Sequence, residues 1–205
     1  MSESDEHYFT ADPSVPFKRQ PVEASVWGHD LRLTSGSGVF AQGRLDIGTS
    51  VLFKETEPPE LADGAHVLDL GCGYGVIGLA LASVLSGVRV TGVDVNERAV
   101  LLANENAASL GLANFTATTP EAVPSDISFD EIWSNPPIRI GKEALHDLLL
   151  SWLPRLAPGG RGVMVVGKNL GADSLQTWLT GQGYPTTRLG SAKGFRVLET
   201  RKVVG

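Results

Sequence analysis

The sequence predicts an α/β protein with a doubly wound, mostly parallel seven-stranded sheet and an N-terminal β-hairpin extension. From residue 61 onward, short apolar segments typical of buried strands alternate with longer segments that have helical periodicity. The first of these strands leads directly into a glycine-rich stretch at 69–75, which is followed by an apolar helix. The chain has 205 residues, of which 42% are hydrophobic, enough to bury the core of one domain.

The first 60 residues predict an arm, a hairpin and a helix. Residues 1–20 are polar and contain two prolines, which indicates irregular structure. Residues 22–38 alternate apolar and polar side chains on either side of a Gly-His-Asp turn, a pattern typical of a β-hairpin. Asp46 can cap a helix over 47–55, which ends before two consecutive prolines.

The remainder, 61–205, predicts the strand-and-helix core, and we treat 1–205 as a single domain. The expected strands are 66–71, 88–95, 115–119, 129–135, 160–168, 185–190 and 195–202. The expected helices are 76–87, 97–112, 143–156 and 172–183. Ligands of parallel α/β sheets bind at the carboxyl ends of the strands, so the loops at that edge are the candidate site.

Composition restricts the possible functions. The net charge is −6, but residues 1–130 carry 7 basic and 18 acidic side chains, whereas residues 131–205 carry 10 basic and 5 acidic ones. The basic part is either a solvated surface or a contact for nucleic acid. Cys72 is the only cysteine, which excludes an intramolecular disulfide and a metal site built from several thiolates. The chain has no apolar segment of membrane-spanning length, so we expect a cytoplasmic protein without a membrane partner.

The glycine-rich stretch at 69–75 predicts a site for a polar or anionic ligand, because its backbone can turn sharply beside the free N–H groups of a helix N-terminus. Residues 73–78 also fit the dinucleotide pattern G-x-G-x-x-G, so a nicotinamide cofactor remains an alternative. Asp94 lies 21 residues after Gly73, where either ligand would need an acceptor for its ribose hydroxyls. Asp69 would repel a pyrophosphate but could pair with the ammonium or sulfonium of S-adenosylmethionine. Alternatively, the Asp69 carboxylate caps the glycine-rich loop by accepting hydrogen bonds from backbone N–H groups.

The stretch Ser-Asn-Pro-Pro after the fourth core strand predicts a rigid row of hydrogen-bond acceptors. Asn135 and Pro136 both precede a proline, which favours extended backbone, and Pro136 and Pro137 have no N–H. An exocyclic amine or an amide nitrogen is a poor nucleophile because its lone pair is delocalised. The Asn135 side-chain oxygen and the Pro136 carbonyl can accept its two hydrogens and favour a tetrahedral nitrogen. We therefore predict that Asn135, Pro136 and Pro137 form the catalytic loop.

Six motifs resemble the class I S-adenosylmethionine-dependent methyltransferases, and more closely the "methyltransferase small" family that includes bacterial 16S ribosomal RNA guanine-N2 methyltransferases. The motifs are GVFAQGRLDIGT, VLDLGCGYGVIGLALA, GVDVNERAV, SNPPIRIGK, GKNLGADSL and SAKGFRVL. The resemblance implies a Rossmann-like core over 61–205 and S-adenosylmethionine as cofactor. The residues that it assigns to cofactor binding are Thr49, Asp69, Gly71, Cys72, Gly73, Asp94, Val95 and Thr118.

Two positions depart from the family pattern. Many relatives that methylate amines carry an aromatic residue after the prolines to stack on the target base, whereas this chain has Ile138. Phe40 is the candidate replacement. Where relatives often place an acid against adenine at the end of the third core strand, this chain offers only Thr118 or Thr119.

The predicted activity is N-methylation of an exocyclic amine, with guanine N2 of ribosomal RNA as the specific acceptor and ribosomal RNA or the small ribosomal subunit as the partner. The residues predicted to contact the substrate are Phe40, Ile138, Arg139, Lys142 and Lys168, with Arg44, Lys193 and Arg196 as further cations at the same edge. Four alternatives remain: another base, a protein glutamine, an NAD-dependent oxidoreductase, and an RNA-binding module for ribosome assembly without turnover.

Overall fold

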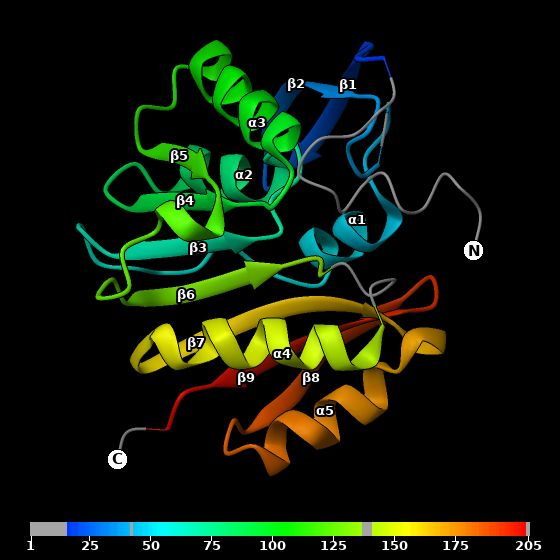
Figure 1. The fold of residues 1–205 in the computed structure, drawn as a ribbon, viewed down its shortest axis with the longest axis vertical. Coiled ribbons are helices and arrows are strands. Elements are labelled where there is room, and N and C mark those ends of the chain that lie inside the picture. The colour runs from blue at the N-terminus through cyan, green and yellow to red at the C-terminus, as the bar shows by residue number, and fades with distance from the viewer. Residues whose placement is uncertain (1–15, 42, 137–140, 204–205) are drawn as a thin grey trace.

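The structure is a computed structural model that describes residues 16–41, 43–136 and 141–203. Pro137, Ile138 and Arg139, three of the predicted site residues, lie outside the described residues. A two-stranded hairpin precedes a seven-stranded sheet whose strand order is β5-β4-β3-β6-β7-β9-β8 (Figure 1). The hairpin strands are β1 (Arg19–Val26) and β2 (His29–Gly36). The sheet strands are β3 (His66–Leu70), β4 (Arg89–Val93), β5 (Phe115–Thr118), β6 (Phe129–Ser134), β7 (Leu156–Gly167), β8 (Thr186–Ala192) and β9 (Phe195–Arg201).

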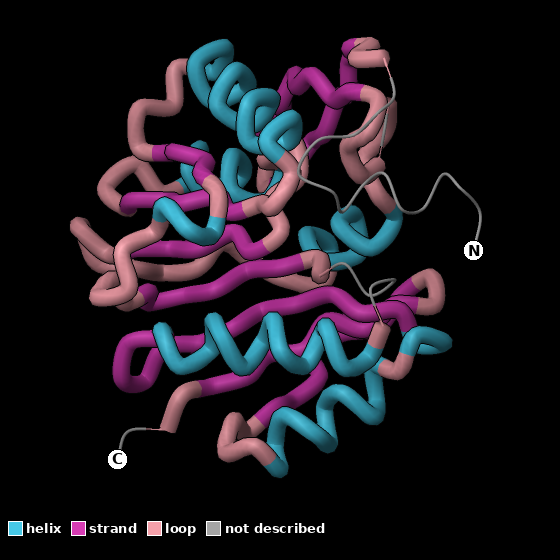
Figure 2. Tube along the Cα trace, in the orientation of Figure 1, coloured by secondary structure: helices cyan, strands magenta, loops and turns pink. Residues whose placement is uncertain are grey.

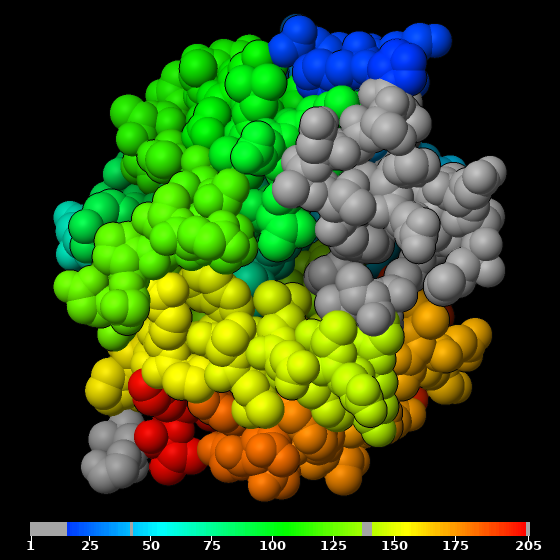
Figure 3. Space-filling model, viewed as in Figure 1, coloured from blue at the N-terminus to red at the C-terminus, as the bar shows by residue number. Residues whose placement is uncertain are grey.

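Helices connect the strands and cover both faces of the sheet (Figure 2). They are α1 (Ile47–Lys54), α2 (Val76–Val84), α3 (Glu97–Leu110), α4 (Lys142–Trp152) and α5 (Ala172–Gly181), with short 3₁₀ turns η2 (Pro120–Ala122), η4 (Leu153–Arg155) and η5 (Lys168–Leu170). In the space-filling view, α3, α4 and α5 cover the molecule from top to bottom (Figure 3). The predicted doubly wound α/β class is therefore confirmed, together with the N-terminal hairpin.

Alternation along the central strands creates two apolar cores, one on each face of the sheet. On β7, Val163 and Val165 pack with the hairpin, α1, α2 and α3, whereas Met164 and Val166 pack with α4 and α5. On β3, Val67 and Leu68 separate in the same way. Successive side chains of a strand point to opposite faces, so strands covered on both faces are apolar throughout.

The sheet is parallel from β5 to β7, and β9 runs antiparallel between β7 and β8. Leu70, Val93 and Ser134 end β3, β4 and β6 at one edge of the sheet. Because β9 runs in the opposite direction, it contributes its first residue to this edge, where Phe195 pairs with Gly167. Phe195 therefore lies at the carboxyl edge, beside the last residue of β7.

Several predicted boundaries were wrong. Helix α2 ends at Val84 rather than at Gly87, and α4 ends at Trp152 rather than at Leu156, which begins β7. The segment 157–160, predicted to be a turn before the fifth core strand, lies within β7, which already begins at Leu156. An irregularity in the pairing of β6 with β7 between Phe129 and Glu131 accommodates these extra residues. Among the described residues, no helix is long and apolar enough to cross a membrane.

Candidate active site

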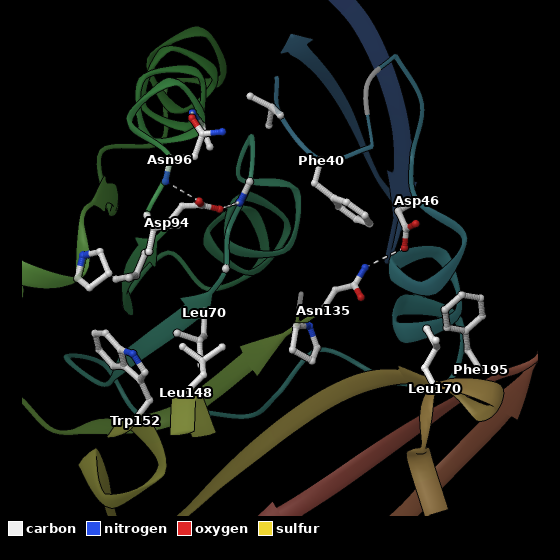
Figure 4. A pocket seen from close by; sticks show the side chains of 18 residues that line it. Phe40, Asp46, Leu70, Asp94, Asn96, Asn135, Leu148, Trp152, Leu170 and Phe195 are labelled. Carbon is white, nitrogen blue, oxygen red and sulfur yellow. Dashed lines mark hydrogen bonds between the residues drawn. The ribbon is translucent and has the colours of Figure 1, made fainter. Parts of the chain in front are cut away.

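A pocket opens at the carboxyl edge of the sheet, between the glycine-rich loop, the end of β4 and the end of β6 (Figure 4). The helix α4, the turn η5, the start of β9 and the segment before α1 complete its wall. The lining residues are Val39, Phe40, Asp46, Leu70, Gly71, Gly73, Val93, Asp94, Val95, Asn96, Ala99, Pro120, Asn135, Pro136, Leu148, Trp152, Leu170 and Phe195. The structure thus brings together the glycine loop, Asp94 and Asn135, which sequence reasoning placed at one edge.

Asp94 follows β4 and holds the glycine loop against it. Its Oδ2 accepts a hydrogen bond from the Gly73 N–H at 2.9 Å, and its Oδ1 accepts one from the Asn96 N–H at 2.9 Å. Burial raises the pKa of the Asp94 carboxyl, and these backbone donors oppose the rise. Because Asp94 also lines the pocket, its carboxylate is held in a fixed position beside any ligand there.

The glycine loop presents bare backbone to the pocket. Gly71 and Gly73 both line it, with φ of 74° and 55°, a region that favours glycine. No atom lies within 4 Å of the position that a Cβ at Gly73 would occupy, so a side chain there would project into open space. Glycine at this position therefore leaves room for a ligand to approach the backbone. Val95, another predicted cofactor residue, follows Asp94 and also lines the pocket. Its side chain is apolar and half-exposed.

Asp69 is buried beneath the glycine loop and is not among the residues that line the pocket. Its Oδ2 accepts a hydrogen bond from the Gly78 N–H of α2 at 2.7 Å, whereas its Oδ1 has no partner among the described residues. Burial raises the pKa of Asp69 to about 7. This placement agrees with the capping alternative and corrects the expectation of direct contact with a cationic ligand.

Asn135, the predicted catalytic residue, is held by the start of α1 and its N-cap. Its Nδ2 donates to Asp46 Oδ2 at 2.8 Å and to Thr49 Oγ1 at 3.0 Å (Figure 4). Asp46 is also the N-cap of α1, since the same Oδ2 accepts from the Thr49 N–H. With both amide N–H bonds committed, Asn135 can offer a further partner only its carbonyl oxygen. Pro136 lines the pocket beside it.

A smaller cavity adjoins the pocket beneath Asn135, and Thr49 and Cys72 both line it. Thr49 is buried, and its hydroxyl oxygen is engaged with Asn135. Cys72 is also buried and lies near Gly92, where an added Cβ would be 3.1 Å from its Sγ. Thr49 therefore helps to orient the Asn135 amide.

Phe40 reaches the pocket on a segment fastened to the start of α3. The Asn96 Nδ2 donates to the Gly38 carbonyl at 2.7 Å, and Val39 is buried. Phe40 itself is 41% exposed and lines both cavities, as its predicted role requires. Asn96 therefore links the strand end that carries Asp94 to the segment that carries Phe40.

The far end of the pocket is apolar, and sequence reasoning missed most of it. Pro120, Leu148 and Trp152 line this end, whereas Thr118 is absent from the lining. Thr118 instead gives its carbonyl to the Asp94 N–H at 3.2 Å, and Pro120 is the nearby residue that lines the pocket. Trp152 is buried but also lines the pocket. The apolar face of α4 was visible in the sequence, but its distance from the pocket was not.

The predicted basic residues surround the pocket rather than line it. Lys142 begins α4 and Lys168 begins η5, and both are exposed. Lys193 is exposed in the turn between β8 and β9. Arg196 forms an ion pair with Asp173 and is therefore less available to a ligand than the lysines. In the part of the chain that the structure describes, no group of three or more His, Cys, Asp or Glu side chains could hold a metal ion.

Comparison with known proteins places this site in a family. The methyltransferase small domain profile matches residues 30–199. The chain is 36% identical to the uncharacterized protein YbxB of Bacillus subtilis (strain 168), over 97% of this chain and 99% of that protein. It is 31% identical to ribosomal RNA small subunit methyltransferase C of Pseudomonas aeruginosa (strain LESB58), over 94% of this chain and 57% of that protein.

A solved structure is also similar. The T. thermophilus 16S rRNA N2 methyltransferase RsmC, in complex with AdoMet and guanosine, superposes with a TM-score of 0.78 at 27% identity, over 93% of this chain and 52% of that one. The chain thus spans slightly more than half the length of these rRNA methyltransferases. Because the profile match covers every residue that lines the pocket, the site itself is part of the shared domain. The chain belongs to the methyltransferase small domain family.

Proposed function

We propose that this protein is an S-adenosylmethionine-dependent methyltransferase that modifies the guanine N2 amine of small-subunit ribosomal RNA. The observation that carries the proposal is the Asn135 amide, whose N–H groups are held by Asp46 and Thr49 so that its oxygen is the acceptor left for a substrate amine. The names of the rRNA methyltransferases and of the guanosine-bound structure support the choice of RNA and of guanine.

The pocket fits the cofactor at both ends. The fixed Asp94 carboxylate can accept hydrogen bonds from ribose hydroxyls, and the apolar wall of Pro120, Leu148 and Trp152 suits a flat adenine ring. The exposed backbone of Gly73 leaves space for the ligand between them. Bound S-adenosylmethionine would supply an electrophilic methyl group on a sulfonium.

The residues of the chain then act on the acceptor nitrogen. Asn135 Oδ1, together with the Pro136 carbonyl, accepts the amine hydrogens and favours the tetrahedral nitrogen whose lone pair can attack. Because Asp46 and Thr49 fix the amide before substrate arrives, little reorganisation is required in the transition state. The methylated ammonium-like product loses its proton to water, so the mechanism needs no strong base.

The test is methyl transfer to unmodified small-subunit rRNA made by transcription, followed by mass spectrometry of the nucleosides. We expect N2-methylguanosine. A different methylated nucleoside would overturn the choice of guanine. Methylation of a protein glutamine instead of RNA would overturn the choice of substrate, and RNA binding without turnover would leave only the assembly-module alternative.

Calorimetry separates the two cofactor classes. We expect S-adenosylhomocysteine to bind and NAD not to bind, whereas the reverse result would favour the oxidoreductase alternative. Asp94→Ala should weaken S-adenosylhomocysteine by roughly 10- to 100-fold, since hydrogen bonds to charged groups contribute about 1.5–3 kcal/mol. Unchanged affinity would remove Asp94 from the cofactor site.

A further inference from the structure

A base that presents its amine to Asn135 needs an apolar surface against at least one of its faces, because unstacked bases are held mainly on aromatic side chains. The sequence after Pro136 provides no aromatic residue before Lys142, since residue 138 is isoleucine. The surface must therefore come from another part of the chain.

Phe195, the first residue of β9, lines the pocket and is partly exposed. Its ring packs against the first turn of α1 at Gly48. A Cβ added to Gly48 would lie 3.0 Å from Cε1 of this ring and 2.9 Å from Asp46 Oδ2, the oxygen that accepts from Asn135. A single backbone turn thus contacts both the ring and the carboxylate that orients the catalytic amide.

Two other apolar side chains flank the same opening. Leu170 of η5 is 55% exposed and Phe40 is 41% exposed, and both line the pocket with Phe195. In the close-up, Phe40 lies above Asn135, and Leu170 and Phe195 lie to its right, near Asp46 (Figure 4). Exposed apolar side chains gathered around a pocket mark a binding surface rather than a random surface composition.

Lysines adjoin this apolar opening. Lys193 is two residues before Phe195 and adopts a positive φ of 50° at the turn between β8 and β9. The Lys168 N–H donates to the Gly194 carbonyl at 2.7 Å, which joins η5 to that turn. Both lysines are exposed, so a flat apolar surface has cations on adjacent loops. This combination suits a nucleotide, whose base stacks and whose phosphate is anionic, better than a glutamine side chain.

We propose that Phe195, rather than Phe40, is the stacking platform for the acceptor base and replaces the aromatic residue that the Asn-Pro-Pro loop lacks, because the turn that it packs against also holds the Asp46 carboxylate that orients Asn135. This inference rests on the proposed function and specifies its substrate as an unpaired nucleotide of RNA. Phe40 and Leu170 complete the apolar opening, and Lys168 and Lys193 contact the flanking phosphates.

The test compares Phe195→Leu, Phe195→Tyr and Phe195→Trp, with the unmodified rRNA transcript as substrate. Leucine keeps most of the packing against Gly48 but removes the aromatic face. We expect Phe195→Leu to raise the KM for RNA about 5- to 100-fold, the range measured for loss of one base–aromatic stack. Tyrosine and tryptophan should stay within a few fold of the wild type, and the Kd of S-adenosylhomocysteine should be unchanged in all three variants.

Leu189→Ala is the matched control, because Leu189 is an exposed apolar residue on β8 outside the pocket, and it should leave KM unchanged. If Phe195→Leu has the wild-type KM, or if it weakens S-adenosylhomocysteine in parallel, the stacking role is overturned while the proposed function stands. If the wild type methylates no RNA, the proposed function and the stacking role are both overturned.

Discussion

At the scale of single residues, the hydrogen bonds of Asn135 decide what its substitutions should do. Its Nδ2 faces the Asp46 carboxylate, and Thr49 accepts the second hydrogen. The family resemblance implies that residues 46–49 lie near the cofactor, but the two bonds themselves could not be foreseen, because 89 residues separate Asp46 from Asn135. The amide itself was predictable, since the two prolines after it mark a rigid loop.

Asn135→Ala should lower the rate of methyl transfer on the order of 10²–10³-fold, as expected when one fixed transition-state partner is lost. The loss should appear in kcat, with the Kd of S-adenosylhomocysteine nearly unchanged, and single-turnover assays would measure it. Asn135→Asp keeps one acceptor oxygen but directs the other at Asp46, so it should retain part of the activity. A wild-type rate for Asn135→Ala would mean that the loop is only scaffolding.

Asp69 should make the stability of the protein fall as pH rises. Its pKa is about 7 in the folded state, above its ordinary 3.8, so it is protonated when folded and ionised when unfolded between these values. Unfolding then releases a proton, and the free energy of unfolding decreases across this window. Asp69→Asn should raise the Tm relative to the wild type, and by more at pH 8 than at pH 5.

Thermal unfolding followed by circular dichroism at several pH values would measure this difference. Asp126→Asn is the matched control, because Asp126 is exposed in the loop before β6, and its Tm should follow the wild-type curve. If the wild type and Asp69→Asn have parallel curves from pH 5 to pH 8, Asp69 has the same pKa in both states.

At the scale of elements, α3 fastens the N-terminal hairpin to the glycine loop. The Asn106 side chain is buried, donates to the carbonyls of Thr34 and Tyr74 at 2.9 Å each, and accepts from the Thr34 N–H at 2.7 Å. One amide thus pairs with backbone groups of β2 and of the segment before α2. Asn106 therefore fixes the position of the N-terminal hairpin relative to the glycine-rich loop.

Asn106→Ala should destabilise the protein by about 1–3 kcal/mol, because it leaves buried backbone groups without partners. Urea unfolding monitored by tryptophan fluorescence would measure the loss. Leu101→Ala on the same helix is the control, since Leu101 is 48% exposed and its removal should cost little. An equal, small effect of both substitutions would show that water replaces the Asn106 contacts.

The elements themselves were largely predictable, because period-two and helical apolar patterns report burial directly. The extended start of β7 was missed, since Pro158 and two glycines at 157–160 have the composition of a turn, whereas pairing with β6 keeps the segment in the sheet. Phe195 was not singled out, although its neighbours Lys193 and Arg196 were expected at the same edge. The antiparallel direction of β9 brings its first residue to that edge.

At the scale of the whole molecule, several of the basic residues of the second half of the chain lie around the pocket. Lys142 and Lys168 begin elements at the pocket edge of the sheet, on a chain whose net charge is −6. Long-range attraction of RNA by the whole protein is therefore excluded as the main source of affinity. Any attraction must come from the local surface around the pocket.

The double variant Lys142→Ala and Lys168→Ala should weaken RNA binding and reduce the slope of log K against log salt concentration by up to about two. Filter binding at several salt concentrations would measure the slope. The control replaces Arg89 and Arg201, which are exposed at the opposite edge of the sheet, and changes the net charge equally. Equal slopes for both double variants would show that the pocket edge is only a solvated surface.

The buried position of Cys72 has a practical consequence. It is the only thiol in the sequence, it belongs to the glycine-rich loop with its side chain buried, and burial raises its pKa. A thiol-specific reagent can therefore react only during moments when the loop lifts from the sheet, and the labelling rate reports how often that happens. A ligand that contacts both Gly73 and Asp94 should keep the loop closed and slow the labelling of Cys72. The labelling rate would then measure how much of the protein has ligand bound in the pocket, without an attached dye or an engineered residue.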